Sequence, residues 1–250
     1  MKSADLQKLS KQMRDSASSM SPAQARCLVD DYYAMQDNRK RAGQQIEASE
    51  SDQHQVLEWL SESASFIEYQ IKCALDSFAG AHPMGIWSMN QKGIGPVLAA
   101  GLIVHIDISK ATTVGHIWRF AGLDPTSKWE RGKKRPHNAA LKQICFHVGE
   151  CLIRSNNTQY RAVYDKRREY EELKNSLGDY SDQAAAVLKN NPHHKQAEIY
   201  KQGKLPDGQL HARSKRYMVK LFLSHWWEQA YRQHFGKEPP LPYPIAQLSH

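Results

Sequence analysis

Several features are scarce in this sequence of 250 residues, and their absence excludes whole classes of protein. No apolar run approaches the roughly 20 residues that span a bilayer, so we expect no membrane-spanning helix. The first residues, 1–5, contain no apolar signal core, so we expect a cytoplasmic protein. No metal-ligand spacing relates its four cysteines, Cys27, Cys73, Cys145 and Cys151. The sequence therefore predicts reduced, buried thiols, and neither a metal site nor a cofactor.

Positive charge is in excess. Lysine and arginine number 34 against 26 acidic residues, so the formal net charge is +8 and the pI about 9.2. Hydrophobic residues make up 40% of the chain, which is enough to form a core. A basic chain of this kind favours a polyanionic partner, and an anionic membrane surface is the weaker alternative. We expect nucleic acid, DNA in preference to RNA, although the sequence does not distinguish the two.

A glycine-containing turn, Lys92-Gly93-Ile94-Gly95, follows a short apolar segment and precedes Pro96. Proline is favoured at the first position of a helix, because its missing N–H would have no partner there. The two glycines are expected to adopt positive φ, and Ile94 to point inward. This pattern predicts a helix-hairpin-helix motif whose backbone N–H groups bind a phosphate without reading a base. The alternative is a tight turn between helices with no ligand.

Before this motif, two stretches carry mostly apolar residues at alternating spacings of three and four, with Arg39 as the charged exception, and polar residues 49–52 separate them. They are Ala25, Leu28, Tyr32, Met35, Arg39, Ala42 and Ile46, and then Leu57, Leu60, Ala64, Ile67, Ile71, Ala74 and Phe78. The spacing predicts an antiparallel helical hairpin, or coiled coil, within residues 1–80. Its seam is incompletely filled, which favours a homodimer through this region. A self-contained hairpin is the alternative.

A basic loop, 126–137, follows a predicted helix over 114–120. Its positive residues are Lys128, Arg131, Lys133, Lys134 and Arg135. Such a run is often merely solvated. Because it lies close in sequence to the hairpin turn, we expect it to contact a nucleic-acid backbone.

The overall expectation is an all-α protein, with the helical hairpin followed by a domain formed by 81–173 and 211–235. Residues 174–210 are polar and are interpreted as an insertion or mobile arm, and 236–250 as a proline-rich tail. A helix over 212–235 is apolar nearly all round and should be central in the core. Its polar strip is basic, which adds Arg213, Arg216 and Lys220 to the expected nucleic-acid contacts.

Four features in this order resemble one family. They are the hairpin turn before Pro96, the segment Phe120-Ala121-Gly122-Leu123-Asp124-Pro125, the basic stretch with its following helix, and the late apolar helix. The chain resembles the C-terminal domain of the Piv/MooV-type insertion-sequence transposases, which also carry a long coiled coil before this domain. The resemblance implies DNA binding and DNA recombination, and it covers somewhat under half of the chain.

Two departures from the family bear on catalysis. Family members begin with an RNase-H-like domain bearing acidic metal ligands, which we expect to be missing here. Their nucleophilic serine lies in a Ser-Gly context, whereas the matching place near Glu130 has none, and Ser127 lies two or three positions earlier. We therefore expect a sequence-nonspecific DNA-binding protein that is not itself an enzyme. The alternative is an active recombinase subunit that uses Ser127 with a partner chain or a guide RNA.

Overall fold

The computed structural model describes residues 7–48, 55–127, 129–130 and 132–240. Within these ranges every regular element is helical, which confirms the all-α class. The elements are α1 (Lys11–Ala17), α2 (Pro22–Ala48), α3 (Gln55–Ala81), α4 (Pro83–Met89), α5 (Pro96–His105), a 3-10 turn (Ile108–Lys110), α6 (Val114–Phe120), α7 (Ala139–Arg154), α8 (Thr158–Ser176), α9 (Ser181–Asn190), α10 (Ala197–Lys201) and α11 (Asp207–Phe235). None of these helices combines the length and the apolar character needed to cross a membrane.

The chain divides into two compact units, 1–111 and 112–250, which are described separately below. The first unit contains α1 to α5, and the second contains α6 to α11. The sequence-based boundary at residue 80 therefore falls inside the first unit, between α3 and the hairpin motif. The difference arises because α4 and α5 pack on α2 and α3 instead of forming a module with the later helices.

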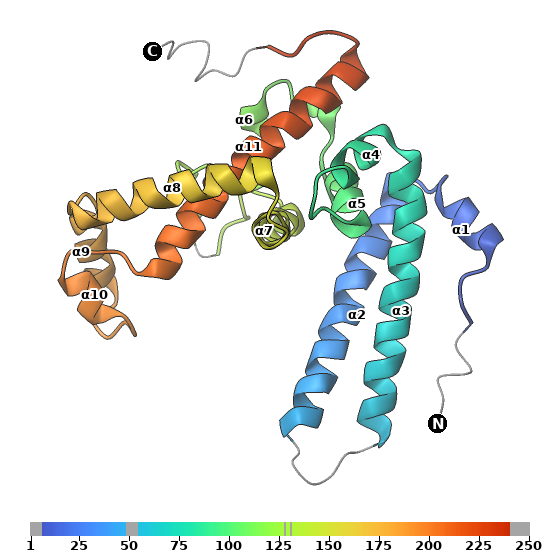
Figure 1. Cartoon of the computed structure of the whole chain (residues 1–250), viewed down its shortest axis with the longest axis horizontal. Helices are drawn as coiled ribbons and strands as arrows, with labels where there is room; N and C mark the ends of the chain where they lie inside the picture. The colour runs from blue at the N-terminus through green and yellow to red at the C-terminus, as the bar shows by residue number, and fades with distance from the viewer. Residues whose placement is uncertain (1–6, 49–54, 128, 131, 241–250) are drawn as a thin grey trace. The chain divides into compact units, whose positions relative to one another are not determined.

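Two long helices, α2 and α3, lie side by side and run in opposite directions in the first unit (Figure 1). Small residues fill much of the seam, with Ala25, Ala42, Ala64 and Ala74 buried. Across it, the guanidinium of Arg39 donates to both carboxylate oxygens of Glu68, at 2.7 and 3.4 Å. Arg39, a charged residue at a seam position, thus pairs across the two helices and helps to define their register.

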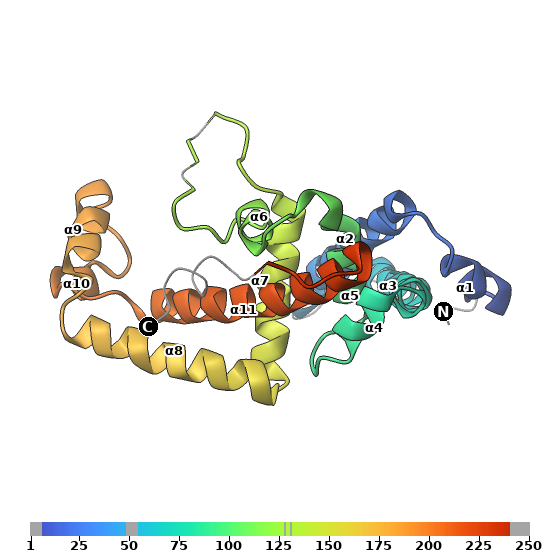
Figure 2. The ribbon, with the colours of Figure 1, turned by 90° about the horizontal axis from the view of Figure 1, so that it is seen from above.

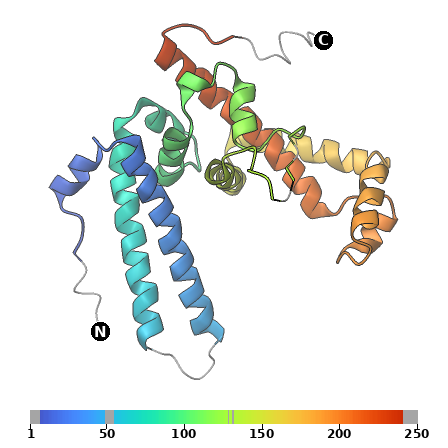
Figure 3. The same ribbon diagram turned by 180° about the vertical axis from the view of Figure 1, so that it is seen from behind.

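The next two helices pack against this pair (Figure 3). The break between α3 and α4 is tight: a Cβ at Gly85 would lie 2.1 Å from the carbonyl oxygen of Ala79, so only glycine fits there. His82 is the N-cap of α4, and its Nδ1 accepts from the amide of Met84 at 3.2 Å. Helix α5 is almost entirely buried, which anchors the second arm of the hairpin motif in the core.

Helix α11 is the central element of the second unit, as its all-round apolar pattern predicts. It packs against α6, α7 and α8, and Figure 2 shows α8 running beside it. Its large buried side chains include Met218, Phe222, Leu223, Trp226 and Trp227. It begins at Asp207, five residues before the predicted start.

The segment 174–210, predicted from its polar composition to be an insertion or mobile arm, is folded. It forms α9 and α10 around a small core of its own, made by Tyr180, Ala184, Tyr200, Leu205 and Leu210. Asn175 fastens the segment to the end of α8 by a reciprocal pair of hydrogen bonds with the backbone of Leu205, at 2.8 and 3.0 Å. Composition alone does not reveal this core, because its apolar residues are few and widely spaced.

The cysteines only partly follow expectation. All four are free and lie in helices, but Cys145 alone is fully buried, and Cys27 is exposed. Burial raises the pKa of Cys145 to about 12, which makes that thiol a poor nucleophile.

Candidate nucleic-acid interface

The hairpin turn between α4 and α5 is shaped by the backbone conformations of its two glycines. Gly93 adopts a φ of +101°, in the left-handed region that favours glycine. The amide of Ile94 donates to the carbonyl of Gln91 at 2.9 Å and closes the turn, and the Ile94 side chain is buried as expected. The expectation for Gly95 was wrong: its φ is −94°, because it serves as the N-cap of α5 and has extended backbone.

Gly95 leaves the start of α5 open. It provides no side-chain cap, and a Cβ built there would meet no atom within 4 Å. Pro96 at the first helical position has no N–H, and the carbonyl of Gly95 accepts from Ala99 at 3.0 Å. The amides of Val97 and Leu98 find no acceptor among the described residues, as is usual at an uncapped helix start. Amides of this kind at a helix start favour an anion, and Lys92, five residues before Val97, is exposed.

The basic loop lies in the second unit, and Figure 2 shows it leaving α6 and returning to the start of α7. Trp129 is half exposed, and its indole N–H donates to the carbonyl of Lys133 at 2.7 Å. The guanidinium of Arg135 lies over the same ring, 5.7 Å from its centroid. Lys133 pairs with Glu130 at 2.7 Å on the surface, and Lys134 is exposed without an ion-pair partner among the described residues. Lys128 and Arg131 lie outside the described residues.

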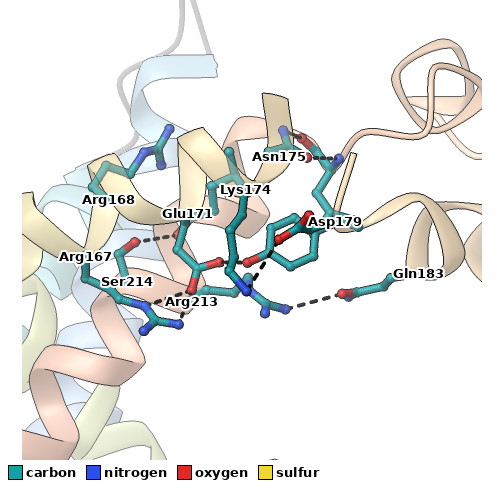
Figure 4. A network of polar contacts seen from close by, with 12 residues as sticks. Arg167, Arg168, Glu171, Lys174, Asn175, Asp179, Gln183, Arg213 and Ser214 are labelled. Atoms are coloured by element: carbon teal, nitrogen blue, oxygen red, sulfur yellow. Dashed lines mark hydrogen bonds and ion pairs between the residues drawn. The ribbon is translucent and has the colours of Figure 1, made fainter. Parts of the chain in front are cut away.

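The three cations predicted on α11 differ in their surroundings. Arg213 is engaged within the protein: its guanidinium donates to Glu171 at 2.8 Å and to Gln183 at 3.3 Å, and it lies 4.5 Å from the ring centroid of Tyr180 (Figure 4). This arrangement gives Arg213 a structural role.

Lys220 lies over the ring of Trp118, 5.0 Å from its centroid, and the indole N–H donates to the Lys220 carbonyl. Burial lowers the pKa of Lys220, an effect that Asp124 opposes and Arg216 reinforces. Arg216 is exposed and has no ion-pair partner among the described residues. It is therefore the α11 cation most available to a ligand.

A cavity of about 360 Å³ in the second unit brings together residues from the loop after α6, from α7 and from α11. Its wall includes Gly122, Leu123, Asp124, Pro125, Ser127, Lys142, Cys145, Phe146, Ala212, Lys215, Arg216 and Val219. Of the residues predicted to act on nucleic acid, Ser127 and Arg216 line this cavity. No described residue hydrogen-bonds the hydroxyl of Ser127, so no base is in place to activate it.

Two cavity lysines, Lys142 and Lys215, escaped the sequence analysis. Lys142 lies on the exposed side of α7, opposite its apolar stripe, and Lys215 lies on α11, which is apolar nearly all round, so local spacing does not mark either lysine. One available signal was the pair Gly122 and Gly149, since helix-flanking or mid-helix glycines often mark a close approach.

Comparisons with protein families, with curated proteins and with solved structures found no match to this chain. Among the described residues, no group of three or more His, Cys, Asp or Glu side chains is placed to hold a metal ion.

Proposed function

We propose that this protein binds the sugar–phosphate backbone of DNA without sequence preference, through the turn between α4 and α5. The observation that carries the proposal is the open N-terminus of α5, where Gly95 leaves the amides of Val97 and Leu98 without a side-chain cap. A phosphate oxygen can approach such amides closely, and the helix dipole favours its negative charge.

The charge of the chain and its resemblance to transposases support DNA as the partner. A net charge of +8 draws the chain toward any polyanion, and the basic loop adds Lys134 and Arg135 as exposed cations. The order of motifs resembles the C-terminal domain of the Piv/MooV-type transposases, which supports a role in DNA recombination. Contacts of this kind carry no base information, so binding would not discriminate between DNA sequences.

The test is a substitution at Gly95. Aspartate is a preferred N-cap residue, the φ of −94° suits it, and its side chain would enter open space. Gly95→Asp should therefore stabilise the first unit by about 0.3–1 kcal/mol, because its carboxylate caps the helix and complements the dipole. The same carboxylate would occupy the anion site and repel phosphate. We expect it to weaken DNA binding by roughly ten- to a hundredfold, the range for losing a hydrogen bond to a charged group.

Two controls separate charge from shape. Gly95→Asn fills the same space without charge and should weaken binding less than Gly95→Asp. Gly43→Asp adds the same charge on α2, where a new Cβ also meets open space, and should leave binding within about twofold of wild type. Binding is measured by fluorescence anisotropy on duplexes of two unrelated sequences. If Gly95→Asp is folded and binds as tightly as wild type, the turn is only a connection between helices.

We further propose that the first unit forms a homodimer through α2 and α3. Most of the large residues in the predicted seam are half buried, and Leu60 is exposed beside Val56 and Trp59 on the same face of α3. Residues at spacings of three and four share a helix face, so these three form an apolar patch. A second copy of the same pair of helices would cover it.

A second candidate function is strand transfer, in which Ser127 would attack a phosphodiester. One observation favours it: Ser127 lines the same cavity as Lys142, Lys215 and Arg216, which could stabilise negative charge on a phosphate. A partner would have to supply the base. In the presence of candidate partners, Ser127→Ala should abolish strand cleavage while DNA binding persists. If the wild type shows no cleavage with any partner, or if the alanine variant retains cleavage, Ser127 is an ordinary loop residue and the strand-transfer function is refuted.

A further inference from the structure

The cavity of the second unit is built around lysines whose positions depend on two glycines. A Cβ at Gly149 would lie 2.7 Å from Cγ and 2.9 Å from Cδ of Lys215, so the lysine stem runs directly over this glycine. At the other side, Gly122 has a φ of +67°, and a Cβ there would lie 2.9 Å from the ring of His137 and 3.1 Å from Cδ of Lys142. Any larger residue at either place would displace a cavity wall.

Lys215 is a buried cation with defined partners. Its side chain is 8% exposed, its ammonium donates to Oε1 of Glu150, and it lies 3.8 Å from the ring centroid of Phe146. Glu150 also pairs with Arg154 at 3.2 Å and lies 3.7 Å from the imidazole of His211. Glu150 thus largely balances the charge of Lys215. The ammonium gives the cavity an oriented hydrogen-bond donor more than net positive charge.

The remaining positive charge of the cavity is not balanced. Lys142 and Arg216 line it and have no ion-pair partner among the described residues. The acid in the wall, Asp124, accepts from the amide and hydroxyl of Thr126 at 2.9 and 2.7 Å and lies 3.8 Å from Arg119. Beside the cavity, burial lowers the pKa of His137, and the charges of Lys142 and Arg135 lower it further. Unbalanced cations around a cavity favour an anionic ligand.

The other part of the wall is apolar and aromatic. Leu123 and Val219 are buried, whereas Phe146 is 53% exposed although Lys215 lies over its ring. An exposed ring beside cations can stack on a nucleobase. The volume of about 360 Å³ lies within the range of roughly 300–1,000 Å³ that small-molecule sites occupy, and is larger than an inorganic phosphate requires.

From this arrangement we propose that the cavity binds one unpaired nucleotide, with its phosphate at Lys142 and Arg216 and its base against Phe146. The proposal rests on the proposed function for nucleic acid as the source of that nucleotide. It adds a second site of a different kind, since the turn at Gly95 contacts the backbone and the cavity requires a base that is free of its partner strand.

The test uses the whole chain and isothermal titration calorimetry with three probes: deoxyadenosine 5′-monophosphate, inorganic phosphate and deoxyadenosine. We expect the nucleotide to bind at least tenfold more tightly than either of the others, because only the nucleotide engages both walls. Lys142→Gln and Arg216→Gln should each weaken nucleotide binding by about tenfold. Phe146→Leu should reduce it by a similar factor while leaving the weaker phosphate binding unchanged.

Lys166→Gln is the matched control, since this exposed lysine on α8 is not part of the cavity and the charge change is the same. It should bind the nucleotide like wild type. Gly149→Ala, which displaces Lys215, should weaken nucleotide binding. Circular dichroism and thermal unfolding identify variants that are not folded.

The outcomes separate this proposal from the DNA-backbone proposal. Gly95→Asp should weaken binding to duplex DNA and keep nucleotide binding. Lys142→Gln should weaken nucleotide binding and keep binding to short duplexes. If the folded wild type binds the nucleotide no better than inorganic phosphate, the base contact is wrong. If it binds neither, or if Lys166→Gln weakens binding as much as Lys142→Gln, the cavity is not a nucleotide site.

Discussion

Removing the carboxylate of Glu171 should loosen the connection between α8, α9 and α11. This side chain is 1% exposed and accepts from Arg167 at 2.6 Å, from Arg213 at 2.8 Å and from the hydroxyl of Tyr180 (Figure 4). In Glu171→Ala, two guanidinium groups and a phenol lose their shared acceptor. Breaking a buried ion pair from one side costs about 3–5 kcal/mol.

We expect the lower part of that range, about 3 kcal/mol, because both arginine side chains are 29% exposed and can regain water. Glu171→Gln keeps the shape and some of the hydrogen bonds, so it should cost about 1–2 kcal/mol. The control is Glu172→Gln, which removes a carboxylate that is 53% exposed and paired with Arg168, and should cost less than about 1 kcal/mol.

Urea denaturation gives the change in unfolding free energy. Hydrogen exchange of peptides from 178–204 shows which part of the chain the substitution destabilises. Exchange in α9 and α10 should accelerate most, because Tyr180 and Gln183 are held through this network. If Glu171→Ala destabilises the protein no more than Glu172→Gln, or if exchange increases equally in the first unit, the network does not hold the segment.

The carboxylate of Glu171 should also make the stability of the protein depend on pH. Burial alone would raise the pKa of Glu171, but hydrogen bonds from Tyr180, Arg167 and Arg213 outweigh it and hold the pKa below the ordinary 4.5. Because the pKa of Glu171 is lower in the folded than in the unfolded protein, its ionised carboxylate stabilises the fold above about pH 4.5. This stabilisation is lost as the pH falls through the pKa of Glu171 in the folded protein. The stability difference between wild type and Glu171→Gln should therefore shrink in acid.

Three further predictions concern other parts of the chain. Leu60→Asp should leave the first unit folded, because Leu60 is 41% exposed. The variant should be a monomer by light scattering where the wild type is a dimer. A wild type that is already monomeric at high concentration refutes the dimer. His105→Leu should stabilise the first unit by about 1–2 kcal/mol, because neither ring nitrogen has a partner in the described structure. Burial and Arg26 lower the pKa of His105, so wild-type stability should fall below about pH 6.5. The stability of the variant should fall less steeply, since burial lowers the pKa of His82 as well. The triple change Lys133/Lys134/Arg135→Ala should flatten the slope of log affinity against log salt by roughly 0.9 for each phosphate of duplex DNA that is no longer neutralised, and an unchanged slope identifies the loop as a solvated charge run.

Local signals in the sequence predict much of the helical pattern. Pro83 and Pro96 mark the first positions of α4 and α5, and Asn138 caps α7 by accepting from the amide of Leu141, so these helices begin where their residues indicate. Such signals act within a turn or two, which makes them readable from spacing alone.

Features that depend on distant contacts could not be predicted in this way. The cavity joins Lys142 to Arg216, 74 positions apart, and nothing local to either residue indicates the other. The pairing of Arg39 with Glu68 likewise depends on how α2 and α3 pack. The core around Tyr180 forms only when α9, α10 and the start of α11 meet.

The position of α11 in the chain has a consequence for the order of folding during synthesis. Helices α6, α7 and α8 are made first, yet each packs on α11, which leaves the ribosome after them. The first unit can fold as soon as residue 111 has emerged, whereas the second must wait, with apolar surface uncovered, for about 120 more residues. A ribosome that stalls before α11 should therefore carry a chain whose first unit resists protease while the rest is digested, and which recruits chaperones until translation resumes.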